Sequence, residues 1–133
     1  MTEDERLHLQ FIQNVITRMN TNSFQIKTFT ITFSAALLTL CINSRNHFYA
    51  LFGLISVISF YAFDAYYLQQ ERKYRMLYND AVKRNVPLYE MNLQKYNINT
   101  FDILFSKTIF PFYFLPIVIL ACLILAYFKQ IPN

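Results

Sequence analysis

Two ionisable residues lie at the edges of apolar runs, where a charge is costly. Asp64 directly follows the apolar run 48–63, and Lys27 closely precedes the run 29–42. Charged side chains inside or at the edge of a hydrocarbon layer are rare, and they are usually paired or functional. The sequence therefore favours one of two roles for Asp64. It forms an ion pair with Lys27, or it belongs to a ligand pocket or a gate.

A basic cluster with interspersed tyrosines follows Asp64. One interpretation is a topology determinant that contacts anionic lipid. The other is a site for a signal molecule or a partner protein, because an arginine beside Tyr67, Tyr74 or Tyr78 can bind phosphate and stack on a base. Glu71 and Arg75 also have the spacing of a helical ion pair. The cluster consists of Arg72, Lys73, Arg75, Lys83 and Arg84.

Catalytic and metal-binding chemistry has little support. Cys41 and Cys122 both lie in apolar runs, where cysteine behaves as a small hydrophobic residue. His8 and His47 are distant in sequence, and the sequence has no H-E-x-x-H or C-x-x-C motif. The single glycine, Gly53, excludes a glycine-rich phosphate loop. We therefore expect a protein that is not an enzyme and that binds no metal and no cofactor.

The composition predicts the kind of element that carries these residues. Hydrophobic residues make up 55% of the 133 residues and charged residues 15%, against about 45–50% and about 25% in soluble domains. With one glycine and four prolines the chain has few turn-forming residues. The expected fold class is an all-α integral membrane protein with three transmembrane helices. It also has an N-terminal amphipathic helix and a long cytoplasmic extension of the second span.

Three apolar runs approach the roughly 20 residues that a membrane-spanning helix needs. The third run is free of charge, and Pro111 and Pro116 in its first half predict a kink or an unravelled first turn. The expected order is a cytoplasmic amphipathic helix (1–23), a first span (24–42), an outer loop (43–47), a second span (48–66), a cytoplasmic helical region (67–107), a third span (108–128) and an outer tail (129–133).

The basic residues predict the orientation, since cytoplasmic loops of membrane proteins are rich in lysine and arginine. In the three-span layout only Arg45 and Lys129 of the 12 basic residues fall on one side. That asymmetry predicts a cytoplasmic N-terminus and an extracytoplasmic C-terminus. The residues on the other side are Arg6, Arg18, Lys27, Arg72, Lys73, Arg75, Lys83, Arg84, Lys95 and Lys107.

Both cytoplasmic segments are expected to be helical. Leu7, Phe11, Val15 and Met19 recur at helical spacing, so the N-terminal helix lies on the membrane or packs on another cytoplasmic helix. It either runs into the first span or bends near 20–23. The second span should continue as one helix over about 48–84, because no glycine or proline interrupts residues 64–84.

A stripe of small and mildly polar residues follows one face of the first span. Thr28, Thr32, Ala35 and Thr39 recur at helical spacing. Such a stripe favours a close contact between helices, or a polar lining that forms when several copies assemble. Three helices of one chain cannot enclose a water-filled pore, so a conducting form would be a homo-oligomer.

Two stretches resemble a group of small bacterial membrane proteins of anti-phage defence loci, similar in plan to the SLATT-type effectors found beside nucleotide-signal or TIR-domain genes. The first is His8-Leu9-x-x-Ile12-Gln13-x-Val15-Ile16-x-Arg18-Met19-x-x-Asn22-Ser23-Phe24-x-x-Lys27. The second is Phe63-Asp64-Ala65-Tyr66-Tyr67-Leu68-x-x-Glu71-Arg72-x-x-Arg75-x-Leu77-Tyr78. The resemblance covers roughly residues 7–84. It implies that the matching residues cluster at the cytoplasmic mouth, namely Arg18, Asn22, Lys27, Asp64, Tyr67, Glu71 and Arg75.

The function that this resemblance implies is an oligomeric inner-membrane effector that permeabilises or depolarises the membrane on a cytoplasmic signal. The alternative is a non-conducting scaffold or anchor that binds and regulates a cytoplasmic partner; a lipid-modifying enzyme has weaker support. The expected partners are the lipid bilayer, further copies of the chain, and a nucleotide-type signal molecule or a cytoplasmic protein. No nucleic acid polymer is expected.

Overall fold

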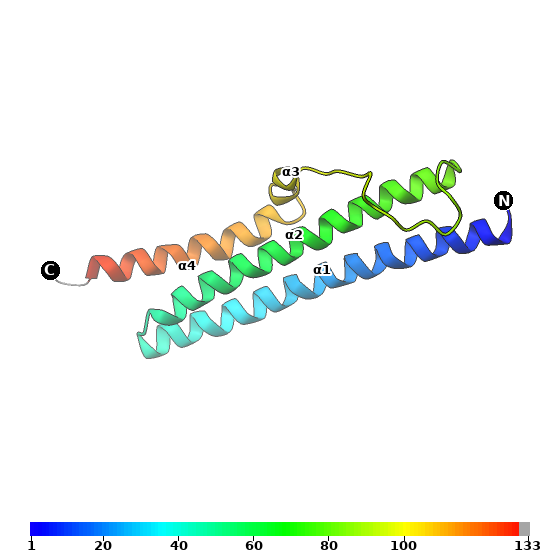
Figure 1. Cartoon of the computed structure of the whole chain (residues 1–133). Helices are drawn as coiled ribbons and strands as arrows, with labels where there is room; N and C mark the ends of the chain where they lie inside the picture. The colour runs from blue at the N-terminus through cyan, green and yellow to red at the C-terminus, as the bar shows by residue number, and fades with distance from the viewer. Residues whose placement is uncertain (131–133) are drawn as a thin grey trace.

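A computed structural model describes residues 1–130 and is built from helices, with no strand in that range. The helices are α1 (Glu3–Ser44), α2 (Phe48–Val82), α3 (Thr100–Leu104) and α4 (Phe110–Gln130). In Figure 1, α1 and α2 lie side by side as a long hairpin, and α4 follows one half of it. We call the end with residues 44–48 the hairpin end, and the opposite end, with residues 3–6 and 82–84, the basic end.

α1 begins at a capping box. The Thr2 hydroxyl accepts a hydrogen bond from the Glu5 amide at 3.1 Å, and the Glu5 carboxylate accepts one from the Thr2 amide at 3.0 Å. Acidic residues in the first turn also suit the positive end of the helix dipole. The helix then continues through residues 20–23 without a break, so the N-terminal segment and the first apolar run form one helix.

α2 is likewise a single helix that passes Asp64 without interruption. It ends at Val82, two residues before the expected end at 84, and Arg84 adopts a left-handed φ of 60°. α4 begins at Phe110, two residues after the predicted start of the third span, and contains Pro116. Of the predicted outer tail 129–133, residues 131–133 lie outside the described residues.

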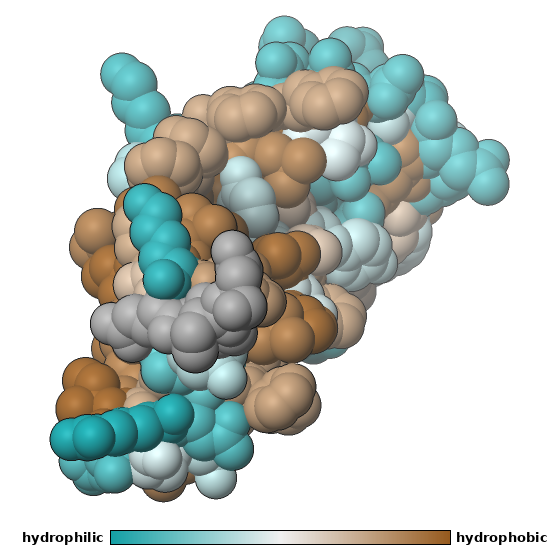
Figure 2. Space-filling model, turned by 90° about the vertical axis from the view of Figure 1, so that its left-hand side faces the viewer, coloured by the Kyte–Doolittle hydropathy of each residue, from teal (hydrophilic) through white to brown (hydrophobic). Residues whose placement is uncertain are grey.

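Three helices, α1, α2 and α4, are long and apolar enough to cross a membrane. Large apolar side chains such as Phe29, Phe52 and Leu115 are more than half exposed on their outer surfaces. Figure 2, which looks at the hairpin end, shows this apolar surface between a few hydrophilic side chains in front and a larger hydrophilic group farther back. Exposed apolar surface of this extent is unfavourable in water, and hydrocarbon would remove that cost.

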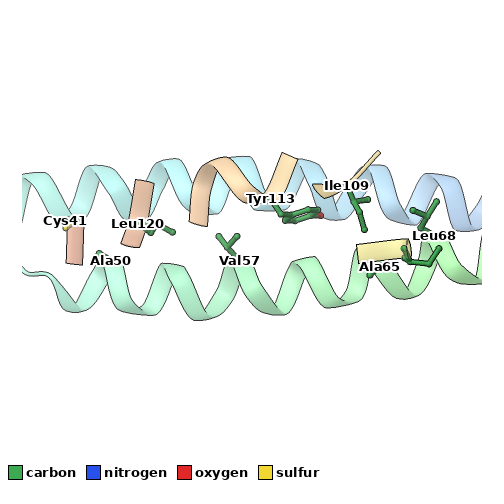
Figure 3. Packing of buried hydrophobic residues seen from close by; sticks show 9 residues of the cluster. Cys41, Ala50, Val57, Ala65, Leu68, Ile109, Tyr113 and Leu120 are labelled. Carbon is green, nitrogen blue, oxygen red and sulfur yellow. The ribbon is translucent and has the colours of Figure 1, made fainter. Parts of the chain in front are cut away.

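Small and medium apolar side chains fill the space between the three long helices. Ala50, Val57, Ala65, Tyr113 and Leu120 are all buried there, and Figure 3 shows them in a line between the helices. Small residues on α2 permit the close approach of neighbouring helices that membrane proteins use. The core of the three candidate spans is therefore thin and continuous along the hairpin.

A second core lies at the basic end. Ile12 and Ile16 of α1 pack with Leu77 of α2 and with Tyr96. Tyr96 comes from residues 83–99, which we call the strap because they fold back along the hairpin. Ile12 and Ile16 are thus covered by α2 and the strap, whereas Leu7 and Phe11 of the predicted apolar face remain exposed.

Polar contacts hold the strap in place. His8 Nε2 lies 2.8 Å from the Glu90 carbonyl oxygen, and Arg84 Nε lies 3.3 Å from Glu5 Oε1. The Tyr96 hydroxyl donates to Asp80 Oδ2 at 2.6 Å. This hydrogen bond holds the pKa of Asp80 below its ordinary value, whereas burial raises the pKa of Tyr96.

Candidate functional site: a polar cluster that joins three helices

The predicted pairing of Lys27 with Asp64 is confirmed. Lys27 Nζ lies 2.7 Å from Asp64 Oδ2. The Asp64 side chain is fully buried, while the Lys27 side chain is 17% exposed. The carboxylate is therefore shielded inside the helix bundle, and only the lysine has a route to the surface.

Two hydroxyl groups complete the surroundings of the carboxylate. The Ser23 hydroxyl donates to Asp64 Oδ1 and accepts a hydrogen bond from Lys27 Nζ at 2.8 Å. The Tyr113 hydroxyl donates to Asp64 Oδ2 at 2.8 Å. Both carboxylate oxygens thus have hydrogen-bond donors, as a buried charge requires. We call Ser23, Lys27, Asp64 and Tyr113 the Asp64 cluster.

Helix geometry explains why these residues meet. Ser23 and Lys27 are four residues apart and therefore share one face of α1. At about 1.5 Å per residue, Asp64 lies about 24 Å from the start of α2, and Lys27 lies about 26 Å from the end of α1. The hairpin connection thus places them at the same level. Tyr113 reaches this level from the first turn of α4, at one edge of a layer about 30 Å thick.

An aromatic contact positions the Tyr113 ring. Tyr61 of α2 stacks on it with ring centroids 5.2 Å apart, and the Tyr61 hydroxyl donates to the Leu104 carbonyl oxygen. Leu104 belongs to α3, which packs against α2. The short helix before α4 therefore helps to fix the tyrosine that bonds to Asp64.

The groups of the Asp64 cluster can hold and exchange protons, because a carboxylate, an ammonium and hydroxyls are all present. They do not resemble a metal site: within residues 1–130 no group of three His, Cys, Asp or Glu side chains is placed to hold an ion. An ionisable residue buried between membrane helices is by default a candidate functional group.

The other residues of the predicted site lie on α1 and α2, displaced from the Asp64 cluster toward the basic end. Glu71 and Arg75 form the predicted pair along α2, with Arg75 Nη2 2.9 Å from Glu71 Oε1. Arg18 is exposed, and Asn22 and Tyr67 are half-buried. In the described part of the chain no hydrogen bond connects these three side chains to Asp64.

The stripe of Thr28, Thr32, Ala35 and Thr39 points outward and is exposed along its whole length. The face of α1 that packs within the chain instead carries Thr30, Ser34, Leu37 and Cys41. Among residues 1–130 the stripe therefore makes no close contact with another helix, and a contact between copies stays a prediction.

Gly53 provides the close approach on α2. A Cβ atom at this position would lie 3.2 Å from Leu37 Cδ1 of α1 and 3.5 Å from two Leu120 atoms of α4. From the sequence, Gly53 with Ser56 was expected to favour contacts between helices of different copies. Its role here is to admit leucines from both neighbouring helices.

Sequence reasoning also missed Ser23 and Tyr113 as members of the site. Ser23 had a detectable signal, since it precedes Lys27 by one helical turn. Tyr113 had a weaker signal, as a tyrosine near the start of a charge-free run. Comparison with known proteins adds nothing to this assignment: no protein-family model, no curated protein and no solved structure matches the chain.

Proposed function

We propose that the protein is a membrane effector that depolarises or permeabilises the membrane on a cytoplasmic signal, and that the Asp64 cluster holds its closed state. The observation that carries the proposal is the buried Asp64 carboxylate, which bonds to side chains of α1 and α4 as well as lying on α2. One ionised group thus ties all three candidate spans together.

A buried ion pair suits a latch better than a simple stabilising contact. Such pairs contribute little net stability, because desolvation offsets much of the attraction. Breaking one partner, however, leaves an uncompensated charge, and here we expect about 1–3 kcal/mol because Lys27 is partly exposed. Helices that separate by a small amount would let water reach Asp64. A modest signal is then enough to change the state.

The basic end supplies a place where a signal can act. Beyond Asp64, α2 continues for about 27 Å at 1.5 Å per residue, paired with α1 and bound by the strap. The excess of lysine and arginine supports a cytoplasmic location for this part. A groove on it is lined by Gln13, Ile16, Arg75, Tyr78 and Asn79. A nucleotide-type signal or a partner protein that binds there would bear directly on both helices.

The exposed stripe supports assembly of several copies, because small residues allow helices of neighbouring chains to approach closely. The resemblance to SLATT-type effectors suggests phage infection as the trigger and the bacterial inner membrane as the location. The alternative is a non-conducting scaffold. It is supported by the long pair of α1 and α2 at the basic end, which could equally bind a cytoplasmic protein.

Induced expression in bacteria with a potential-sensitive dye separates the two functions. Asp64→Ala should lower the membrane potential without any trigger, whereas Asp102→Ala, which removes an exposed carboxylate of α3, should behave like the parent. If Asp64→Ala inserts in the membrane at parental levels and leaves the potential unchanged, the effector proposal is wrong and the scaffold is preferred.

A further inference from the structure

Two basic side chains near the junction of α3 and α4 have no carboxylate partner. Arg75 and Arg84 of the basic cluster are each paired with a glutamate. Among residues 1–130, Arg72 and Lys107 form no such ion pair. Lys107 is exposed, and Arg72 is half-buried beside Ser106. Both positive charges are thus left without an ionic partner in the described part of the chain.

Ser106 holds the Arg72 guanidinium in place. Its hydroxyl accepts a hydrogen bond from Arg72 Nη2 at 3.1 Å and another from the Thr108 amide at 3.3 Å. The serine is 9% exposed, and its hydroxyl donates to no group within residues 1–130. Arginine has five N–H donors, and only the one bonded to Ser106 is used within the same residues. The unused donors suit the oxygens of an anion, since charge-assisted hydrogen bonds are the strong ones.

The dipole of α4 makes the uncompensated charge less favourable still. Lys107 lies three residues before Phe110, where α4 begins. The N-terminus of a helix carries a partial positive charge, which favours anions and disfavours cations. The carboxylate of α3, Asp102, is exposed and pairs with neither cation in the described range. A negatively charged group bound at this junction would offset both cations and the helix dipole.

The junction lies at the same edge of the apolar layer as the Asp64 cluster. Tyr113, in the first turn of α4, bonds to Asp64, and Figure 1 shows α3 beside the start of α4. Arg72 lies eight residues beyond Asp64 on α2, about 12 Å at 1.5 Å per residue. Side chains lean toward the N-terminus of their helix, so Arg72 leans back toward the layer and reaches Ser106. Its guanidinium is thus closer to the layer than its backbone, at the level of lipid headgroups outside the roughly 30 Å of hydrocarbon.

Exposed phenylalanines continue from the junction along α4. Phe101 and Phe105 are 67% and 64% exposed, and Phe114 is 53% exposed. The Phe105 and Phe110 ring centroids lie 5.3 Å apart, and those of Phe110 and Phe114 lie 5.2 Å apart. The rings form a row that begins near the two cations and continues along the third candidate span. A soluble anion would leave this row uncovered, whereas acyl chains at the membrane boundary would cover it.

We propose that Arg72, Ser106 and Lys107 bind the phosphate of an anionic phospholipid, whose acyl chains pack on Phe105 and Phe110. The charges of the site and the phosphate are complementary, and the adjoining aromatic row favours a lipid over a soluble phosphate. The site narrows the lipid interpretation of the basic cluster to Arg72 and adds Lys107, which lies outside that cluster. It is separate from the groove proposed for the signal and does not depend on the proposed function.

Tryptophan quenching tests the site, because the chain has no tryptophan of its own. Phe105→Trp introduces one beside the junction, and the purified full chain is reconstituted in mixed vesicles of phosphatidylcholine and phosphatidylglycerol. In one set of vesicles the anionic lipid carries brominated acyl chains, which quench a tryptophan in contact with them; in the other set the neutral lipid carries them. Quenching of Phe105→Trp should show a several-fold preference for phosphatidylglycerol. Phe52→Trp, on an exposed position of α2 near the hairpin end, should show no preference.

The cations are then removed in the Phe105→Trp background. Adding Arg72→Gln or Lys107→Gln should lower the preference by up to about fivefold, the effect of one basic residue near an anionic surface. Arg6→Gln, which removes an exposed arginine at the basic end, should retain the preference. Because Lys107 is exposed, its replacement guards against misfolding of the Arg72→Gln protein.

Three outcomes would overturn the lipid site. Phe105→Trp shows no preference for the anionic lipid, both Arg72→Gln and Lys107→Gln keep the preference, or Arg6→Gln lowers it equally. Replacing sodium chloride by sodium phosphate at equal ionic strength should leave the preference unchanged. If inorganic phosphate removes it, the site binds a soluble anion and the lipid assignment is wrong.

Discussion

At the scale of single residues, the cluster depends on complete pairing of one carboxylate. Asp64 is fully buried and receives hydrogen bonds from Ser23, Lys27 and Tyr113. Hydrogen bonds to a charged group are stronger than those between neutral groups, and losing one leaves the buried charge less well solvated. Removing any one of these donors should therefore lower the stability of the fold.

Removing one hydroxyl tests this at Tyr113. Tyr113→Phe keeps the ring that stacks on Tyr61 and deletes only the donor to Asp64. We expect a loss of about 1.5–3 kcal/mol, the range for hydrogen bonds to charged groups, visible as a lower unfolding midpoint of the detergent-solubilised protein. Tyr66→Phe, on an exposed ring of α2, is the matched control. Equal midpoints for the two variants would show that the Tyr113 hydroxyl contributes nothing to the cluster.

At the scale of the elements, much of the fold was predictable and the contacts between helices were less so. Hydropathy located three long apolar helices, because a span is a local property of the sequence. The pairing of Lys27 with Asp64 was predictable because each residue lies at the same edge of two consecutive apolar runs. The addition of Ser23 and Tyr113 depends on how α1 and α4 rotate about their axes. The stripe on α1 is a second example. Its spacing did not reveal that the neighbouring face, with Thr30 and Ser34, is the one that packs against the other helices.

Close packing at Gly53 yields a prediction for α2. Gly53→Leu would place side-chain atoms where Leu37 and Leu120 already lie, and overpacking of this kind costs about 1–3 kcal/mol. Ala62→Leu, on the exposed face of the same helix, should be nearly neutral. Thermal unfolding in detergent measures both. A Gly53→Leu protein as stable as the parent would contradict the packing of α1, α2 and α4 at this level.

The strap yields a prediction for the basic end. Tyr96→Phe removes the hydrogen bond that lowers the pKa of Asp80, so that pKa should rise toward its ordinary value. A carboxyl group whose pKa is lower in the folded than in the unfolded protein stabilises the fold at pH values above its unfolded pKa, here 3.8. This stabilisation is lost as the pH falls through the pKa of the folded state. The variant should therefore release the strap at neutral pH.

Limited proteolysis between residues 83 and 99 at pH 7 is the readout for strap release. Tyr96→Phe should be cut faster than the parent, and Tyr89→Phe, whose ring is exposed, should be cut less readily than Tyr96→Phe. Cleavage of Tyr96→Phe at the parental rate would show that the strap does not depend on Asp80.

At the scale of the whole molecule, the three long helices and the uneven distribution of basic residues favour one orientation of the chain in a membrane. The hairpin end holds Arg45 and lies opposite the strap, and most lysines and arginines lie at or near the basic end. A membrane that surrounds the apolar surface of α1, α2 and α4 would leave the strap on one side. The charge bias favours the cytoplasm for that side.

Reporter fusions test this arrangement. A reporter inserted in the strap between Pro87 and Asn97 should be active only as a cytoplasmic fusion, and one fused after Asn133 should be active only outside. The two positions are separated by one predicted span, which is the physical reason for opposite results. A cytoplasmic reading at both positions would require an even number of crossings between them and would contradict the three-span arrangement.

The most direct test of the latch is a charge exchange between Lys27 and Asp64. Lys27→Ala and Asp64→Ala should each depolarise the membrane without a trigger, because each leaves its partner charge unpaired at the edge of the apolar layer. The double variant Lys27→Asp with Asp64→Lys restores opposite charges at the same level and should return the membrane potential at least partly to the parental value. If both single variants and the exchange keep the parental potential, the Asp64 cluster does not hold a closed state.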